Sequence, residues 1–206
     1  MHLVAAVAAS ALLLTGCNSG GTPGGTDTAS PSASQTASPS ATPTPTVTAV
    51  YKPADATGRA QNVPVPVLPE VAKTETKEGL EAFAKYWFEL LSYGYETGDT
   101  ALMSAVTSPN CIMCEHAKEV QKGWNEGGRW LGGGLIATPS VSTNFRTAPD
   151  GNYQVAVQVS QEALSYYNPD DSLDSADPKP ADTGNLMLAV FKNGTWFVST
   201  IEPIEG

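Results

Sequence analysis

The sequence predicts an α+β domain in which N-terminal helices pack in a curved antiparallel sheet of about four strands, preceded by a disordered linker. Two observations carry this fold class. Apolar residues recur at helical spacing between about residue 76 and residue 125. After residue 129, short runs of alternating apolar and polar residues are separated by Gly, Pro and Asn, which is typical of strands. We therefore expect residues 51–206 to form a single domain.

An apolar run from Leu3 to Leu14 has the length of a signal-peptide core and is too short to cross a bilayer of about 30 Å as a helix. No Lys or Arg precedes it, only His2, so we expect the true start to lie upstream and to bring a basic stretch. Leu14-Thr15-Gly16-Cys17 resembles the lipobox of bacterial lipoproteins. This resemblance implies a signal peptide over residues 1–16 and a diacylglyceryl group on Cys17. The alternative is a buried core helix with a chance cysteine.

A lipidated Cys17 would place the rest of the chain on the outer face of the cell membrane, since two acyl chains suffice for stable anchoring. Residues 17–50 are almost entirely Ser, Thr, Pro, Gly and Ala, and Asp27 is their one charge. Such a segment buries too little apolar area to offset the entropy of ordering. We expect a disordered spacer, either unmodified or O-glycosylated.

Composition changes at Tyr51, where charged, aromatic and aliphatic residues begin. Residues 51–75 include Val63-Pro64-Val65-Pro66-Val67-Leu68-Pro69, whose prolines disfavour a helix and a central strand. Its large apolar residues predict an extended lead-in that docks on the domain.

A long amphipathic helix is expected from about residue 76 to residue 97. Its apolar face follows spacings of three and four and consists of Leu80, Phe83, Ala84, Trp87, Leu90, Leu91 and Gly94. Gly98 is placed to end this helix, and Asp99 to cap a short second helix over residues 100–106. Ser108-Pro109 predicts the start of a third helix ending near Asn125. Its expected inward residues are Met113, Ala117, Val120 and Trp124.

Strands are expected in the remainder. Arg129 to Phe145 is interrupted by Gly132-Gly133-Gly134 and Pro139, which predicts one long bent or bulged strand, or two short ones. Residues 153–160 alternate strictly. Residues 186–192 and 195–204 form a hairpin, because Asn193-Gly194 favours a tight type I′ turn. Residues 168–183 are expected to be a long acidic loop.

This order of elements resembles the nuclear-transport-factor-2-like (SnoaL-like) cone fold. More specifically, the domain resembles an uncharacterised family of actinobacterial lipoproteins. The stretches that carry this resemblance are Asn62-Val63-Pro64-Val65-Pro66, Phe83 to Trp87, Tyr95-Glu96-Thr97-Gly98-Asp99, Ser108-Pro109-Asn110-Cys111-Ile112-Met113-Cys114, and Trp130 with Gly132-Gly133. The resemblance implies a fold and a location, and no substrate.

Cys111 and Cys114 are the two cysteines left after Cys17. At this spacing in a first helical turn, and outside the cytoplasm, they are expected to form a disulfide. Two alternatives are a thiol-disulfide oxidoreductase and a zinc site that also uses His116. The sequence lacks the surrounding βαβ unit of the first and a fourth ligand for the second.

No pair of carboxylates or nucleophile elbow suggests catalysis, so we predict no catalytic residue, cofactor or metal ligand. Four aromatic residues could line a pocket or fill the core: Trp87, Tyr93, Tyr95 and Trp130. The densest acidic cluster is interpreted as a solvated loop, with a calcium site as the alternative; it comprises Asp170, Asp171, Asp174, Asp177 and Asp182.

The formal net charge of −10 argues against a nucleic-acid partner. The sequence thus favours a non-enzymatic binding or interaction domain, whose partner is an envelope protein or a small apolar ligand. The alternative is a cone-fold enzyme acting on a small envelope metabolite.

Overall fold

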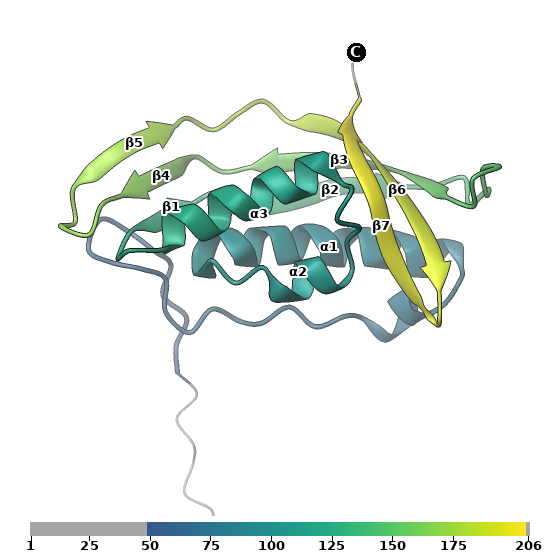
Figure 1. Cartoon of the computed structure of the whole chain (residues 1–206), viewed down its shortest axis with the longest axis horizontal. Coiled ribbons are helices and arrows are strands. Elements are labelled where there is room, and N and C mark those ends of the chain that lie inside the picture. The colour runs from purple at the N-terminus through teal and green to yellow at the C-terminus, as the bar shows by residue number, and fades with distance from the viewer. Residues whose placement is uncertain (1–48, 205–206) are drawn as a thin grey trace, which may run out of the picture. The chain divides into compact units, whose positions relative to one another are not determined.

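The computed structural model describes residues 49–204, so the signal peptide, Cys17 and nearly all of the spacer lie outside the described residues. The fold is α+β, as predicted, with helices and two antiparallel sheets (Figure 1). The helical elements are a 3₁₀ turn at Glu70–Lys73, α1 Lys77–Thr97, α2 Ala101–Ala105 and α3 Ile112–Asn125. The strands are β1 Trp130–Gly133, β2 Ile136–Ser142, β3 Tyr153–Gln161, β4 Leu164–Tyr167, β5 Leu173–Asp177, β6 Thr183–Lys192 and β7 Thr195–Pro203.

Helix α1 forms the centre of the core. The Thr76 side chain accepts a hydrogen bond from the Gly79 N–H (3.0 Å) and so caps the first turn. Gly98 ends the helix in the left-handed conformation (φ 74°). All seven residues of the predicted apolar face are buried. None of the helices within residues 49–204 is both long and apolar enough to span a membrane.

The strands form a four-stranded sheet in the order β2-β3-β6-β7 and a three-stranded sheet in the order β1-β4-β5. Their pairing continues round a corner, because the Gly134 N–H donates to Ala163 O and the Glu162 N–H donates to Leu135 O, both at 2.9 Å. A Cβ atom on Gly133 would lie 2.2 Å from Ala163 O, and φ there is +79°, so this corner requires glycine. Of the two alternatives for residues 129–145, two short strands is correct.

The prediction of one long loop over residues 168–183 is wrong, because the segment contains β5. This strand pairs antiparallel with β4, which the sequence pattern did not predict either. Every residue of β5 is exposed. The alternation that marks a buried strand is therefore absent, and backbone pairing with β4 determines the conformation.

The predicted start of the third helix at Ser108-Pro109 is also wrong. The Ser108 N–H donates to Val198 O (2.8 Å), which holds this segment against β7. Helix α3 begins at Ile112, with Cys111 as its N-cap residue. Of the four residues predicted to face inward, Ala117 is buried, and Met113, Val120 and Trp124 are half-buried; Cys114 and Gln121 complete the buried face.

The lead-in belongs to the domain. Its first part is a hairpin closed by the bridges Lys52–Gln61 and Asp55–Gly58, and the Arg59 guanidinium donates to the Asn125 carbonyl (2.8 Å) at the end of α3. In the following proline-rich stretch Leu68 packs against the core, as expected of a docked segment. Val65 and Val67 instead point to solvent.

Candidate functional site

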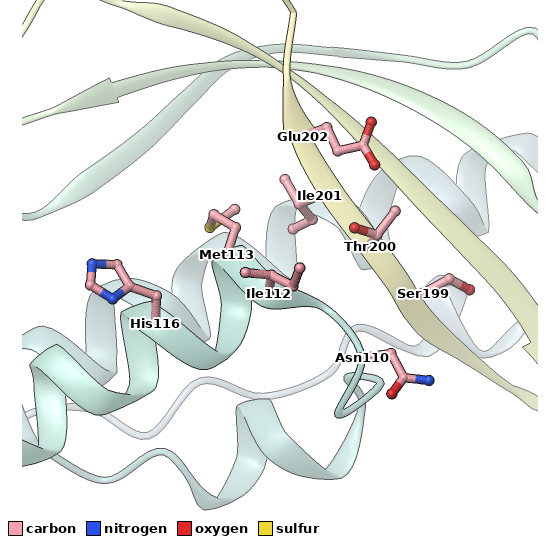
Figure 2. Close-up of a pocket in the computed structure, with 8 residues that line it drawn as sticks. All are labelled: Asn110, Ile112, Met113, His116, Ser199, Thr200, Ile201 and Glu202. Carbon is pink, nitrogen blue, oxygen red and sulfur yellow. The ribbon is translucent and has the colours of Figure 1, made fainter.

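An open groove lies between the first turns of α3 and the second half of β7 (Figure 2). Its volume is about 690 Å³. The lining residues come from these two elements and the turn before α3: Asn110, Ile112, Met113, His116, Ser199, Thr200, Ile201 and Glu202. The Ser108 N–H, shortly before α3, donates to Val198 O of β7 and so holds the start of the helix beside the strand.

The floor of the groove is apolar. Ile112 is 85% exposed, the largest exposed fraction among the described large apolar residues. Figure 2 shows Ile112 and Met113 from α3 on the same side as Ile201 from β7. Ile201 itself is buried and Met113 packs against the core, whereas Ile112 projects into solvent beside them. An aliphatic side chain this exposed is an available contact for a partner.

The wall of the groove is a free sheet edge, because β7 is the last strand of its sheet. At Val198 this edge is covered by the segment before α3, since Val198 N–H donates to Val106 O (2.9 Å) and Val198 O accepts from Ser108 N–H. Over Ser199–Glu202 no backbone hydrogen bond joins the outer edge to another segment within residues 49–204. The groove therefore presents unpaired backbone beside apolar side chains.

The rim of the groove is acidic. Glu202 lines it directly, and an adjoining hollow along α3 contains Glu115 and Glu119. Lys118 pairs with Glu115 (2.5 Å) and neutralises one of these charges. The rim is thus suited to a neutral or basic partner.

The carboxyl groups whose pKa values are shifted lie outside the groove. The pKa values of Asp55, Asp150 and Asp170 are lowered, because each of these exposed side chains accepts hydrogen bonds from the residue two positions later. Such shifts are the signature of local turns. They do not supply the raised pKa of a general acid.

Cys111 and Cys114 form a disulfide, as predicted, with their Cα atoms 5.2 Å apart. Both residues are 0% exposed. The bonded sulfur atoms leave no thiolate for zinc, and no three potential metal ligands cluster within the described part of the chain. Burial also separates the pair from the accessible thiols of an oxidoreductase.

We expect the double variant Cys111→Ser/Cys114→Ala to lose about 2 kcal/mol of unfolding free energy, because a short loop of the unfolded chain is no longer closed. Serine at residue 111 keeps an N-cap acceptor for α3. Urea unfolding followed by tryptophan fluorescence measures the change. An unaltered midpoint would show that the disulfide contributes nothing beyond packing.

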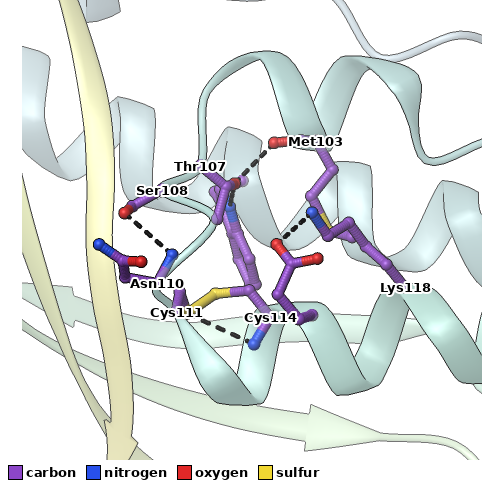
Figure 3. The surroundings of a disulfide bond; sticks show 9 residues. Met103, Thr107, Ser108, Asn110, Cys111, Cys114 and Lys118 are labelled. Atoms are coloured by element: carbon purple, nitrogen blue, oxygen red, sulfur yellow. Dashed lines mark hydrogen bonds and ion pairs between the residues drawn. A yellow bond between two sulfur atoms is a disulfide. The ribbon is translucent and has the colours of Figure 1, made fainter.

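A buried polar network lies beside the disulfide (Figure 3). The Trp87 indole Nε1–H donates to Thr107 Oγ1 (2.8 Å), and the Thr107 hydroxyl donates to Met103 O (2.6 Å). This network ties α1 to the end of α2, next to the point where the chain reaches β7.

We expect Thr107→Val to reduce stability by about 1–3 kcal/mol, because the Trp87 N–H is left buried without an acceptor. The shape of the side chain hardly changes, so the loss reports the hydrogen bonds. Thr138→Val in β2 is the matched control, since no hydrogen bond of the Thr138 side chain is found among the described residues. Equal unfolding midpoints for the two variants would contradict the assignment.

None of the four aromatic residues proposed as pocket lining contributes to the groove. Trp87 and Trp130 are buried, and Trp130 stacks on Tyr167 with ring centroids 5.2 Å apart. Tyr93 and Tyr95 are half-buried, and burial raises the pKa of Tyr95. The groove residues were not singled out from sequence, because an apolar residue at the start of a helix carries no sign of what lies opposite.

The predicted acidic cluster is exposed throughout. Asp170 accepts hydrogen bonds from Ser172 in a local turn. Asp177 accepts a hydrogen bond from the Tyr166 hydroxyl (2.8 Å), and burial together with this bond raises the pKa of Tyr166 to about 12. These aspartates are engaged in turns and strand contacts.

Three solved structures are similar to this chain at low scores. The intermembrane space region of the chloroplast protein ARC6 has a TM-score of 0.42 and 11% identity, covering 64% of this chain and 98% of that one. Aln2 from a Streptomyces species has a TM-score of 0.36 and 10% identity, covering 61% and 88%. An uncharacterised protein with a cystatin-like fold from Caulobacter vibrioides has a TM-score of 0.31 and 15% identity, covering 60% and 84%. At these scores the similarities carry no conclusion about function.

Comparison with curated protein sequences found no match. One family profile, described as a family of unknown function, matches residues 49–202. The match includes the lead-in, all three α-helices and nearly all of β7, and therefore both sides of the groove. The chain belongs to the family of unknown function DUF6318.

Proposed function

We propose that this protein is a lipoprotein of the outer face of the cell membrane, anchored by a diacylglyceryl group on Cys17, whose domain binds a partner without catalysis. The observation that carries the binding role is the open groove with Ile112 exposed over its floor. The lipobox resemblance and the polar spacer support the location.

The chemistry of the groove favours binding. Acid–base catalysis requires titratable groups whose pKa values are pushed apart in one site. The carboxyl groups with lowered pKa values lie in exposed turns outside the groove, and the Cys111–Cys114 disulfide is buried. What the groove offers is apolar contact, unpaired backbone, the carboxylate of Glu202 and the imidazole of His116.

The shape of the groove favours a polypeptide over a small apolar ligand. Small-molecule sites are concave and bury about 70–90% of the ligand surface. Here one side is a helix, the other is a strand edge, and the groove opens to solvent. An envelope protein that presents a segment to this groove is the partner that fits best.

A capture experiment with matched variants tests this role. The full chain in detergent, its Ile112→Ser variant and its Val67→Ser variant are used to capture partners from a cell-envelope extract. Val67 is 80% exposed on the lead-in and does not line the groove, so Val67→Ser controls for loss of any exposed aliphatic residue. We expect quantitative mass spectrometry to find a protein retained by the native chain and by Val67→Ser and lost with Ile112→Ser. Equal retention by all three chains would contradict a role for the groove, and a retained small molecule would favour a ligand-binding or enzymatic domain.

A further inference from the structure

We propose that the groove accepts its partner as an added β-strand: an extended segment with alternating apolar residues and basic flanks that pairs with β7 over Ser199–Glu202. This inference rests on the proposed binding function and specifies the chemistry of the partner.

The first argument is that the outer edge of β7 already accepts a strand-like segment. Thr107 and Val198 form a parallel bridge, and the Val106 carbonyl and the Ser108 N–H both bond to the backbone of Val198. That intramolecular pairing stops where α3 turns away. The next residues of β7 keep the same free edge and open into the groove. An incoming strand would continue a pairing that the fold has begun.

The second argument is the weak protection of this edge. Natural sheets protect exposed edges with lysines, prolines, bulges or a covering segment. In β7 the covering segment ends at Val198, and Ser199, which has no partner between Leu188 and Ala189 of β6, forms a bulge at the start of the free stretch. Pro203 then limits the free stretch at its other end. Between this bulge and Pro203, Thr200–Glu202 contains no Lys or Pro, so a short added segment can pair there.

The third argument is the side-chain period of a strand. Alternate residues of an added strand point to one face. On the groove side they would meet the exposed Ile112 and Met113, which packs against the core that contains Ile201. An apolar residue at every second position would cover the exposed Ile112.

The fourth argument is charge. Glu202 lines the groove, Glu115 and Glu119 line the adjoining hollow with Lys118 paired to Glu115, and the whole chain has a formal net charge of −10. Lys or Arg at the outward and flanking positions of the segment would complement this rim. The same charge disfavours a second copy of this chain as the occupant, since pairing two β7 edges would bring two acidic rims together.

A displayed library of random short peptides provides the test. Peptides are selected on the full chain in detergent and then sorted by whether Ile112→Ser weakens binding. Each selected peptide is resynthesised in two versions, one with backbone N-methyl groups on the odd-numbered residues and one with them on the even-numbered residues. In a strand, the two versions block opposite edges. An N-methyl group removes one hydrogen-bond donor and blocks the strand edge on which it lies. Only the version whose N-methyl groups face β7 should therefore bind more weakly, by about tenfold or more.

We expect the Ile112-dependent peptides to alternate apolar residues, to be enriched in Lys and Arg, and to slow hydrogen exchange at amides within Ser199–Glu202. Ile112→Ser should weaken binding about tenfold, as expected for loss of a buried aliphatic contact, and Val67→Ser should leave it unchanged.

Two outcomes would overturn the inference. Strand addition would be excluded if both N-methylated versions of the Ile112-dependent peptides bound as well as the unmethylated peptide, or if the peptides left amide hydrogen exchange in β7 unchanged. Binding at the groove would still stand. A library that yields no Ile112-dependent peptide would also exclude it, and the capture experiment would then decide the proposed function separately.

Discussion

Gly94→Ala is expected to destabilise the domain by about 3 kcal/mol, a loss typical of overpacking in a tight core. Gly94 of α1 faces Gln121 of α3, and an added Cβ atom would lie 2.2 Å from Gln121 Oε1 and 2.6 Å from its Cδ. Gln121 cannot easily move aside, because it is fully buried and its Nε2 donates to Leu91 O (2.7 Å). The clash should outweigh the better helix propensity of alanine, which is about 1 kcal/mol.

Gly123→Ala provides the matched control for this prediction. Gly123 also lies within a helix, yet a Cβ atom there would meet no heavy atom within 4 Å. The control should therefore gain stability of up to about 1 kcal/mol. Urea unfolding of both variants should give midpoints that move in opposite directions.

Adding Gln121→Ala to Gly94→Ala should recover part of the loss, which a double-mutant cycle would reveal as coupling between the two residues. A Gly94→Ala variant as stable as Gly123→Ala would show that α1 and α3 are less closely packed than described.

The sequence predicted the elements whose signal is local or whose faces are buried. Helix α1 follows its 3.6-residue apolar period. In β3, Val155, Val157 and Val159 are buried, in line with the strict alternation. The β6–β7 hairpin turns at Asn193-Gly194, where both residues have positive φ (51° and 78°). In each case the residues that determine the structure lie within a few positions of one another.

The errors arise where distant contacts decide the structure. Strand β5 is exposed on both faces, so its composition resembles a loop, and only pairing with β4 makes it a strand. Helix α3 starts later than Ser108-Pro109 predicts, because Val198 of a strand far along the chain binds the Ser108 N–H.

The candidate site shows the same division. The Cys111–Cys114 pair was predictable, since its spacing alone brings the two side chains together. The groove required α3 and β7 to meet, and nothing near Ile112 in the sequence indicates Ile201 opposite it. Of the aromatic residues proposed for a pocket, Trp87 and Trp130 are buried instead, and Tyr93 and Tyr95 are half-buried away from the groove.

Cys17→Ala is expected to abolish lipid attachment completely, which is the largest effect on localisation that a single substitution in this chain should have. The proposed anchor requires the Cys17 thiol, because the diacylglyceryl group is carried by a thioether that alanine cannot form. Two acyl chains bind a bilayer stably, at about 0.8 kcal/mol for each buried CH₂ group, whereas an unmodified Ser-, Thr- and Pro-rich segment has no comparable affinity. Mass spectrometry of the N-terminal peptide should show a lipidated residue 17 in the native chain and an unmodified one in the variant. Detergent phase partitioning should move the variant from the detergent phase towards the aqueous phase.

The variant Cys111→Ser/Cys114→Ala is the control for this experiment, because it removes the other two cysteines of the chain and should keep the lipid. Lipid attached to the Cys17→Ala chain, or a native chain whose N-terminal peptide carries no lipid, would contradict the lipoprotein proposal. The groove between α3 and β7 would stand under either result, because its geometry depends on residues of the folded domain alone. The two halves of the proposed function can therefore fail independently. Loss of the anchor would leave a binding domain of unknown location, and loss of Ile112-dependent binding would leave a lipoprotein of unknown partner.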